Sequence, residues 1–162
     1  MLLFIARHAW AGHFGDPGWP DDSLRELTPD GIVRYRQVVQ RLAEQGFAPE
    51  RIASSPYVRC QQTAQIIADE LPGDYQVEEL PALQPGADLE ALLEWTASQA
   101  SEAVCWVGHN PDVEWMTESL VTEPNATFVF KKGSVAAIEF AAEAKVKAGQ
   151  LLWHATAKSL GV

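Results

Sequence analysis

The stretch Leu2-Leu3-Phe4-Ile5-Ala6-Arg7-His8 decides the fold class, because an uninterrupted apolar run leads directly into a guanidinium and an imidazole. Such a run is typical of a β-strand that is covered on both faces of its sheet. The run Ala103–Val107 repeats the pattern and is followed by Gly108 and His109. The sequence therefore predicts two buried strands that each deliver a histidine to the rim of a sheet.

Amphipathic stretches lie between the apolar runs. A Gly-, Pro- and Asp-rich loop is expected from Trp10 to Ser23, and Thr28 followed by Pro29 predicts the start of a helix that ends at Gly46. The other expected elements are strands over Arg51–Ser54, Tyr75–Glu79, Val135–Phe140 and Leu151–Thr156, a helix capped by Ser55-Pro56 that stops at Pro72-Gly73, a helix capped by Asp88, and a helix after Asn110-Pro111 that includes Met116 and Leu120.

Strands that alternate with helices predict an α/β fold with a largely parallel central sheet flanked by helices. The last two expected strands pair antiparallel at one side of that sheet. A length of 162 residues favours one domain, and no repeat or linker divides the chain. We therefore expect a single three-layer domain over residues 1–162.

Composition narrows the classes of function. The chain has 12 Lys and Arg against 22 Asp and Glu, which gives a net charge of −10 and disfavours nucleic acid and anionic membranes as partners. No apolar run approaches the ~20 residues that span a bilayer, and no secretory signal is visible, so we expect a cytoplasmic protein. Cys60 and Cys105 are too few for a disulfide scaffold or a four-ligand zinc site and are interpreted as core residues.

The scarce cations gather at the predicted carboxyl ends of strands, where open α/β sheets bind their ligands. Arg7 and His8 follow the first strand, Arg59 lies one helical turn beyond Ser54-Ser55-Pro56, and His109 follows the later buried strand. Guanidinium groups bind phosphate oxygens in a bidentate way, and imidazoles act as nucleophiles or proton carriers near neutral pH. The pattern indicates a phosphate site.

Four segments in the same order resemble the histidine phosphatase (phosphoglycerate mutase-like) superfamily, and within it the short SixA-type phosphohistidine phosphatases. They cover most of the chain, from residue 1 to about 140. The segments are Arg7-His8-Ala9 for the Arg-His-Gly signature, Leu27-Thr28-Pro29-Asp30-Gly31 for the Leu-Thr-x-x-Gly helix opening, Ser54-Ser55-Pro56-Tyr57-Val58-Arg59-Cys60-Gln61-Gln62-Thr63-Ala64 for the Ser-Ser-Pro-x-x-Arg-x-x-Gln-Thr-Ala segment, and Gly108-His109-Asn110-Pro111 for the second histidine motif.

The resemblance implies a phosphoglycerate mutase-like fold and a role for each matched residue. His8 is the nucleophile that becomes a phosphohistidine, Arg7 and Arg59 bind the phosphoryl oxygens, and His109 is a further donor to the phosphoryl group. The resemblance implies no metal and no cofactor. No pair of carboxylates in the predicted rim is spaced for two metal ions, which agrees with this.

The sequence departs from the resemblance at two places. Ala9 replaces the glycine that usually follows the nucleophile, which requires a negative φ at this residue. Ala82 stands where many relatives have a glutamate that acts as the general acid. Glu78, Glu79 and Asp16 are open alternatives for the proton donor.

The missing acid bears on the substrate. An alkoxide leaving group needs a proton, whereas a protonated phosphohistidine expels a neutral imidazole whose conjugate acid has a pKa near ~6.5. We therefore expect a phosphorylated protein of the histidine-phosphotransfer type as partner. The short segment between Glu78 and Ala103 leaves no room for a large cap, so a protein loop can enter and a mutase is disfavoured. Two alternatives stay open: a phosphomonoesterase acting on a small phosphorylated substrate, and a catalytically slow phosphoprotein-binding module.

Several other residues have ordinary structural interpretations. His13 and His154 are expected to be solvated or hydrogen-bonded. Trp10 and Trp19 either pack in the core or line the mouth of the site. The pair Lys131-Lys132 is either solvated or faces a phosphoprotein partner.

Overall fold

The computed structural model describes residues 1–162 and contains six strands and four α-helices. The strands are β1 (Leu2–Arg7), β2 (Arg51–Ser54), β3 (Val77–Glu79), β4 (Ala103–Gly108), β5 (Val135–Glu139) and β6 (Gln150–Ala155). The helices are α1 (Pro29–Ala43), α2 (Val58–Glu70), α3 (Leu89–Ser98) and α4 (Asp112–Leu120), with short 3-10 helices η1 (Asp22–Leu24) and η2 (Pro81–Leu83). All strands belong to one sheet in the order β3-β2-β4-β1-β5-β6.

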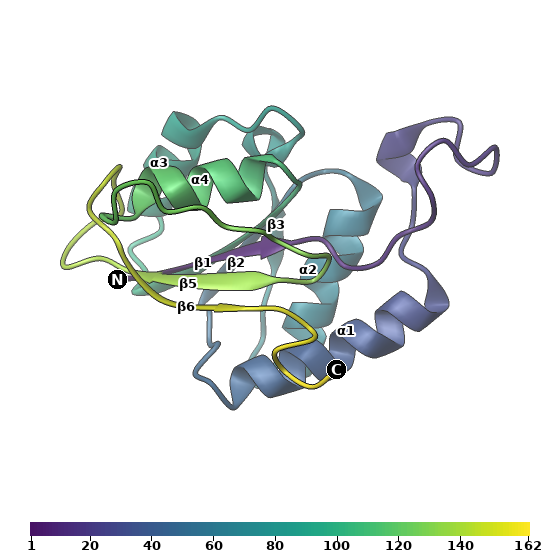
Figure 1. The fold of residues 1–162 in the computed structure, drawn as a ribbon, viewed down its shortest axis with the longest axis horizontal. Helices are drawn as coiled ribbons and strands as arrows, with labels where there is room; N and C mark the ends of the chain where they lie inside the picture. Colours follow the sequence, from purple (N-terminus) through teal and green to yellow (C-terminus); the bar gives the residue numbers. More distant parts are fainter.

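The sheet is parallel on one side and antiparallel on the other. The pairs β1–β4, β2–β4 and β2–β3 are parallel, whereas β5 runs antiparallel to both β1 and β6. In Figure 1 the helices α3 and α4 cover the upper face of the sheet, and α1 and α2 cover the lower face. This arrangement confirms the predicted α/β fold with a largely parallel central sheet between two helical layers.

Alternation along β1 explains why its apolar run is uninterrupted. Phe4 and Ala6 point to the core that α1 and α2 cover, whereas Leu3 and Ile5 point to the core that α3 and α4 cover. All four side chains are at most 1% exposed, so β1 is buried on both faces. Burial of both faces removes any polar position from the strand interior, which is why no alternating pattern appears.

Most predicted helix starts are confirmed. The Thr28 side chain accepts a hydrogen bond from the Gly31 amide, and the Asp88 side chain accepts one from the Ala91 amide. The prediction that Ser55 caps the second helix is wrong, because α2 begins at Val58 without any side-chain cap. Ser55 Oγ instead accepts a hydrogen bond from the Tyr57 amide at 3.3 Å and faces the carboxyl end of the sheet.

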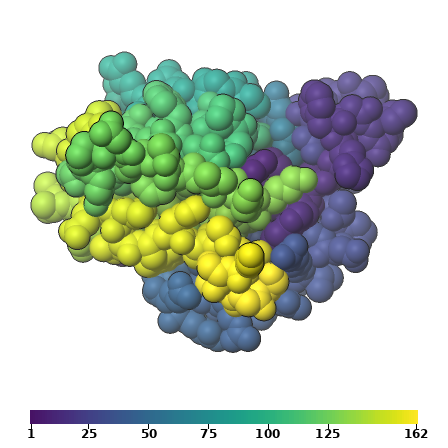
Figure 2. Space-filling model, in the orientation of Figure 1, coloured from purple at the N-terminus to yellow at the C-terminus, as the bar shows by residue number.

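The loop between β1 and α1 leaves the sheet and returns to it. It contains η1, and an isolated bridge between Ala11 and Leu27 closes its base. In Figure 2 this purple segment forms the upper right corner of the molecule and protrudes from it. None of the helices has the length and apolar character needed to cross a membrane.

Candidate active site

The register of the parallel strands brings the predicted site residues to one level. Arg7 is paired with Gly108 across β1 and β4, and the His8 amide donates to the Gly108 carbonyl at 3.0 Å. The Ser55 amide donates to the Val107 carbonyl at 3.0 Å. The chain leaves β1, β2 and β4 at this level, so the rings of His8 and His109 lie with their centroids 5.6 Å apart.

The hydrogen bonding of His8 fixes its tautomer. Nδ1 of His8 lies 2.8 Å from the carbonyl oxygen of Ala9. Because a carbonyl only accepts, Nδ1 carries the proton and Nε2 keeps its lone pair. Burial, together with the charges of Arg59 and Arg7, lowers the pKa of His8 to about 3. The ring is therefore neutral near pH 7, with a lone pair that no protein group occupies.

Ala9 is compatible with this geometry. Its φ is not positive, and the residue is fully buried, so the methyl group that replaces the usual glycine causes no backbone strain. The Ala9 amide donates to Thr63 Oγ1 at 3.0 Å, and Thr63 Oγ1 donates to the Arg59 carbonyl at 2.7 Å. The first turns of α2 therefore fix the backbone on which His8 is held.

Arg59 lies in the first turn of α2, and its side chain is 5% exposed. Its Nη1 donates to the Asp22 carbonyl at 2.8 Å, and its Nη2 lies 3.1 Å from the Asp22 carboxylate. Nη2 also lies 3.3 Å from Nδ1 of His109. Its guanidinium lies over the Tyr57 ring, 4.9 Å from the centroid. These contacts hold the guanidinium at the carboxyl ends of β1 and β4.

His109 connects Arg59 to Ser55. Since guanidinium groups only donate, Nδ1 of His109 accepts from Arg59, and Nε2 carries the proton and donates to Ser55 Oγ at 2.8 Å. Burial, reinforced by the charge of Arg59, lowers the pKa of His109 to about 3. Cys60 Sγ lies 3.5 Å from Nε2 of His109, and burial raises the pKa of this thiol to about 12. Cys60 is therefore a neutral packing group.

Arg7 is held from the opposite side. Its Nη1 donates to the Phe130 carbonyl at 2.7 Å. The Phe130 amide donates to Glu114 Oε1 at 2.8 Å, and Asn110 Nδ2 donates to the same oxygen at 2.8 Å. Burial lowers the pKa of Arg7, and the charge of Glu114 opposes that shift. The second histidine motif thus positions Arg7 through Asn110 and the Phe130 backbone.

Both guanidinium groups keep a buried donor without a partner. Nε of Arg7 and Nε of Arg59 are buried and make no hydrogen bond to any protein group. A buried N–H without an acceptor costs about 1–3 kcal/mol, and more when the group is charged. Both arginines lie close enough to His8 for their charges to lower its pKa. The chemistry that matches them is an oxyanion with several acceptor oxygens.

Sequence analysis missed two residues at this site. Asp22 and Arg25 come from the loop before α1, where Arg25 Nε donates to Asp22 Oδ1 at 2.9 Å and Arg25 Nη1 donates to the Gly12 carbonyl at 2.6 Å. Partial burial opposes ionisation of Asp22, but hydrogen bonds and charge from Arg25 and Arg59 hold its pKa below the ordinary value. The sequence did contain a signal for this pair: Arg25 is an isolated arginine beside several acidic residues in a chain that has few cations.

The sequence-predicted proton donors Asp16, Glu78 and Glu79 make no hydrogen bond to the site residues, although Glu79 is paired with Ser54 at the carboxyl end of β2. Asp16 is exposed, and its carboxylate accepts a hydrogen bond from the Gly18 amide in a local turn. Glu78 and Glu79 are exposed on the edge strand β3. None of the three forms a hydrogen bond or ion pair with His8, Arg7, Arg59 or His109. No group of three or more His, Cys, Asp or Glu side chains is arranged to hold a metal ion.

The remaining tryptophans and histidines named in the sequence analysis lie in different environments. Trp10 is half-buried under the Arg34 guanidinium, which lies 4.3 Å from the ring centroid. Trp19 is half-buried in the loop beside Gly12, whereas His13 is exposed. His154 is half-buried with its ring 4.6 Å from that of Phe130.

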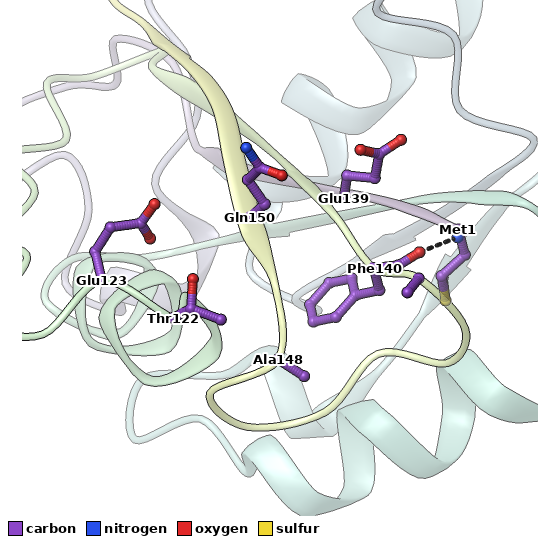
Figure 3. A pocket seen from close by; sticks show the side chains of 8 residues that line it. Met1, Thr122, Glu123, Glu139, Phe140, Ala148 and Gln150 are labelled. Atoms are coloured by element: carbon purple, nitrogen blue, oxygen red, sulfur yellow. Dashed lines mark hydrogen bonds between the residues drawn. The ribbon is translucent and has the colours of Figure 1, made fainter.

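A sizeable pocket also lies at the end of the sheet opposite to the candidate site. A pocket of about 640 Å³ is lined by Met1, Glu123, Glu139 and Gln150, at the end of β1 opposite to His8. Figure 3 shows Met1 beside Phe140, joined by the hydrogen bond from the Met1 nitrogen to the Phe140 carbonyl at 2.7 Å. This pocket contains carboxylates but no imidazole or guanidinium.

Comparison with known proteins agrees with the geometry at the carboxyl ends of the strands. The family model described as the histidine phosphatase superfamily (branch 1) matches residues 3–119, which include all four motif segments. The chain belongs to the histidine phosphatase superfamily. As a histidine phosphatase it is a hydrolase that acts on phosphoryl groups.

Two similar sequences and one similar solved structure narrow the position of this chain within the superfamily. An uncharacterised protein of Picosynechococcus sp. is 39% identical over 119 residues, which are 71% of this chain and 70% of that protein. The phosphohistidine phosphatase SixA of Escherichia coli (strain K12) is 30% identical over 125 residues, 74% of each protein. A structure of the protein histidine phosphatase SixA complexed with tungstate superposes with a TM-score of 0.83, at 26% identity and with 99% of both chains covered. The resemblance to SixA-type proteins is thereby confirmed.

Proposed function

We propose that this histidine phosphatase hydrolyses phosphohistidine on a protein substrate, with His8 as the nucleophile and without a metal ion. One observation carries the proposal. Two buried guanidinium donors, Nε of Arg7 and Nε of Arg59, lack protein partners, and the charges of both arginines act on a neutral imidazole, His8, whose Nε2 is unprotonated. A tetrahedral phosphoryl group supplies the missing acceptors and the electrophile at once. The similar SixA structure is a complex with tungstate, itself a tetrahedral oxyanion.

In the first displacement, the Nε2 lone pair of His8 attacks phosphorus, and the bond between phosphorus and the substrate imidazole breaks. The bonding electrons leave with the substrate ring, whose other nitrogen already carries a proton, so the leaving group is neutral imidazole. His8 becomes cationic, with its proton still on Nδ1. The Ala9 carbonyl, 2.8 Å from Nδ1, stabilises that cation.

In the second displacement, water attacks phosphorus and the bond to Nε2 of His8 breaks, and both protons of the water leave with the product as dihydrogen phosphate. The electrons return to Nε2, and the ring regains its starting tautomer because the Nδ1 proton never leaves the Ala9 carbonyl. Arg7 and Arg59 stabilise the negative charge of the equatorial oxygens in both steps. The one N–H of His109 is held by Ser55 Oγ and its Nδ1 accepts from Arg59, so His109 positions the Arg59 guanidinium and donates to the phosphoryl group only when a phosphoryl oxygen replaces Ser55 Oγ.

The absence of a carboxylic acid at the site supports a nitrogen leaving group. Asp22 is the carboxylate that contacts Arg59, but its lowered pKa keeps it ionised near pH 7, so it has no proton to give. A phosphate ester expels an alkoxide and needs that proton, whereas phosphohistidine does not. The segment between β3 and β4 forms η2 and α3, which pack on the sheet, so this segment supplies no large cap, which supports a protein substrate.

Trapping and turnover test the proposal together. The wild-type protein should acquire the mass of one phosphoryl group on His8 after brief mixing with a phosphorylated histidine-phosphotransfer domain, and His8→Ala should not. The variant His13→Ala, which changes an exposed histidine, is the matched control and should retain the label.

Relative turnover identifies the substrate. We expect kcat/KM for the phosphohistidine protein to exceed that for simple phosphate esters by about a hundredfold or more, the usual contribution of a general acid to ester cleavage. Faster turnover of an ester would identify a phosphomonoesterase instead. Label that is captured on His8 but never released would identify a phosphoprotein-binding module.

A further inference from the structure

A second, strongly basic pocket adjoins the catalytic rim. Its volume is about 580 Å³, and Arg7 lines it from the catalytic side. We refer to it as the basic pocket. Its lining residues are Arg7, Trp10, Arg34, Lys131, Lys132, Thr156, Ala157 and Lys158, of which five are cations and none is acidic.

The basic pocket is built from four separate segments of the chain. Trp10 follows β1, Arg34 belongs to α1, Lys131 and Lys132 precede β5, and Lys158 follows β6. In Figure 2 the surfaces of these segments meet on the face turned to the viewer, where purple, blue, light green and yellow atoms adjoin. Tertiary folding, rather than a run of basic sequence, therefore gathers these charges.

The cations of the basic pocket form no ion pair with an Asp or Glu side chain. Arg25, Arg36, Arg41 and Arg59 form the four ion pairs of the molecule, so the five cations of the pocket form none, although the chain has 22 Asp and Glu. Nη2 of Arg34 donates only to the Val162 carbonyl, at 2.9 Å. Burial and the charges of Arg7 and Arg25 lower the pKa of Lys132. Mutually repelling cations that are held together without an ion pair to Asp or Glu favour an anionic ligand.

We propose that the basic pocket binds acidic side chains that flank the phosphohistidine of the substrate protein. This proposal rests on the proposed function, since it assigns a recognition surface to the same reaction. Arg7 belongs to both sites, so an acidic segment lying in the basic pocket continues directly into the phosphoryl site.

The size and chemistry of the pocket favour a peptide segment over one phosphate. A volume of about 580 Å³ is within the range of sites that hold drug-sized ligands, far larger than a single oxyanion. Lysines present mobile point charges, which suit carboxylates spread over a surface, whereas fixed bidentate sites use arginine. A net charge of −10 repels an acidic partner from the rest of the molecule, so this patch also orients the encounter.

Matched peptides and matched variants test the proposal. One peptide carries phosphohistidine flanked by glutamates, and the other replaces these with glutamines. The variant Lys131→Gln/Lys158→Gln removes two exposed charges of the pocket, and Arg51→Gln/Lys145→Gln removes two exposed charges at the opposite end of the sheet. We expect the wild type and the control variant to prefer the glutamate peptide by about tenfold in kcat/KM, through KM, and the preference to weaken with salt.

The pocket variant should lose that preference while its kcat and its activity on the glutamine peptide stay within twofold of wild type. An unchanged preference in the pocket variant, or none in the wild type, would overturn the proposal. If the pocket variant instead loses activity only toward a small substrate with a second phosphate, the pocket belongs to small-molecule recognition and the proposal is equally overturned.

A binding measurement separates this proposal from the proposed function. Fluorescence anisotropy with a labelled hexaglutamate peptide reports the pocket without any turnover. Binding by the wild type that the pocket variant loses, together with no hydrolysis of either phosphohistidine peptide, would retain an acidic-ligand pocket and reject the phosphohistidine phosphatase. Hydrolysis of both peptides without hexaglutamate binding would reject only the pocket.

Discussion

At the scale of single residues, Asp22 places a negative charge against the guanidinium groups of Arg25 and Arg59. The side chain of Asp22 is 35% exposed, so it is able to withdraw when another anion competes for Arg59. A phosphoryl dianion that approaches Arg59 meets the repulsion of this carboxylate. We therefore expect Asp22 to weaken the binding of oxyanions to the proposed phosphoryl site.

The variant Asp22→Asn removes that repulsion while keeping the shape of the side chain. We expect its inhibition constant for vanadate or phosphate to fall about threefold to tenfold, since a partly exposed pair contributes about 1 kcal/mol. Competitive inhibition assays measure this directly. Asp16→Asn is the control and should change the constant less than twofold, and weaker binding by Asp22→Asn would mean that the carboxylate positions Arg59 instead.

Ala82 is the residue, at the same scale, on which the proposed discrimination against ester substrates depends. It lies in η2, and the next residue, Leu83, packs so that its Cδ2 would be 3.7 Å from a Cβ placed on Gly108. Ala82 is therefore close to the turn that carries His109, yet it has no group to donate a proton.

The variant Ala82→Glu supplies a carboxylic acid at this position. We expect kcat/KM for an alkyl phosphate ester to rise by about tenfold or more, because general acids contribute about 10²–10⁴-fold to such reactions, while phosphohistidine hydrolysis changes little. Ala82→Gln has the same bulk without the acid and should not raise ester turnover. Equal gains in both variants would show that packing, not proton donation, is responsible.

At the scale of elements, the start of α1 is packed directly onto the loop that follows His8. The Thr28 amide donates to the Trp10 carbonyl at 2.9 Å. A Cβ on Gly31 would lie 2.4 Å from that carbonyl oxygen and 2.8 Å from Thr28 Oγ1. The glycine of the Leu-Thr-x-x-Gly segment therefore permits the helix to approach the backbone beside the nucleophile.

The variant Gly31→Ala should be destabilised by about 1–3 kcal/mol, the usual cost of overpacking. The sign is informative, because replacing a helical glycine by alanine at an unobstructed position stabilises by about 1 kcal/mol. Urea denaturation measures the free energy of unfolding. Val33→Ala, at an exposed position of the same helix, should change it by no more than about 0.5 kcal/mol, and a stabilised Gly31→Ala would contradict the close approach.

At the scale of the whole molecule, two buried neutral histidines make stability depend on pH. The pKa values of His8 and His109 are about 3 in the folded protein, against an ordinary value of 6.5. Between these values the unfolded chain binds protons that the folded protein does not. The free energy of unfolding therefore falls as the pH decreases from about 6.5 toward 3.

Each of the two histidines should contribute up to about 1.4 kcal/mol per pH unit to this slope. Urea denaturation of the wild type and of His109→Gln between pH 6 and pH 4.5 measures the difference in slope. We expect the variant to lose stability less steeply, even if it is less stable at pH 7. His13→Gln is the control, and parallel slopes for the wild type and His109→Gln would show that His109 is protonated in the folded state.

Much of the fold could be predicted from local sequence patterns, because apolar runs and helix caps each depend on residues within one segment. The apolar run of β1 and its carboxyl-terminal Arg7-His8 are readable without any partner strand. Thr28 and Asp88 cap helices through hydrogen bonds to residues three positions away. Ser55 was wrongly predicted to cap α2, because a serine just before a helix usually accepts a hydrogen bond from a helix amide. In the structure Ser55 Oγ accepts from the Tyr57 amide, which precedes the helix, and from His109, a residue distant in sequence.

The sequence by itself determined the order of strands and helices along the chain. It also indicated that Arg7, His8, Arg59 and His109 lie at one rim of the sheet, because each of them stands at the end of a predicted parallel strand or at the start of the helix that follows one. Only the tertiary structure decided that Asp22 pairs with Arg25 and Arg59, which protons the two imidazoles carry, and that Arg34, Lys131 and Lys158 surround one pocket. These features depend on distances between segments that share no local pattern. Burial and charge, which set the ionisation of each group, exist only once those segments have packed together.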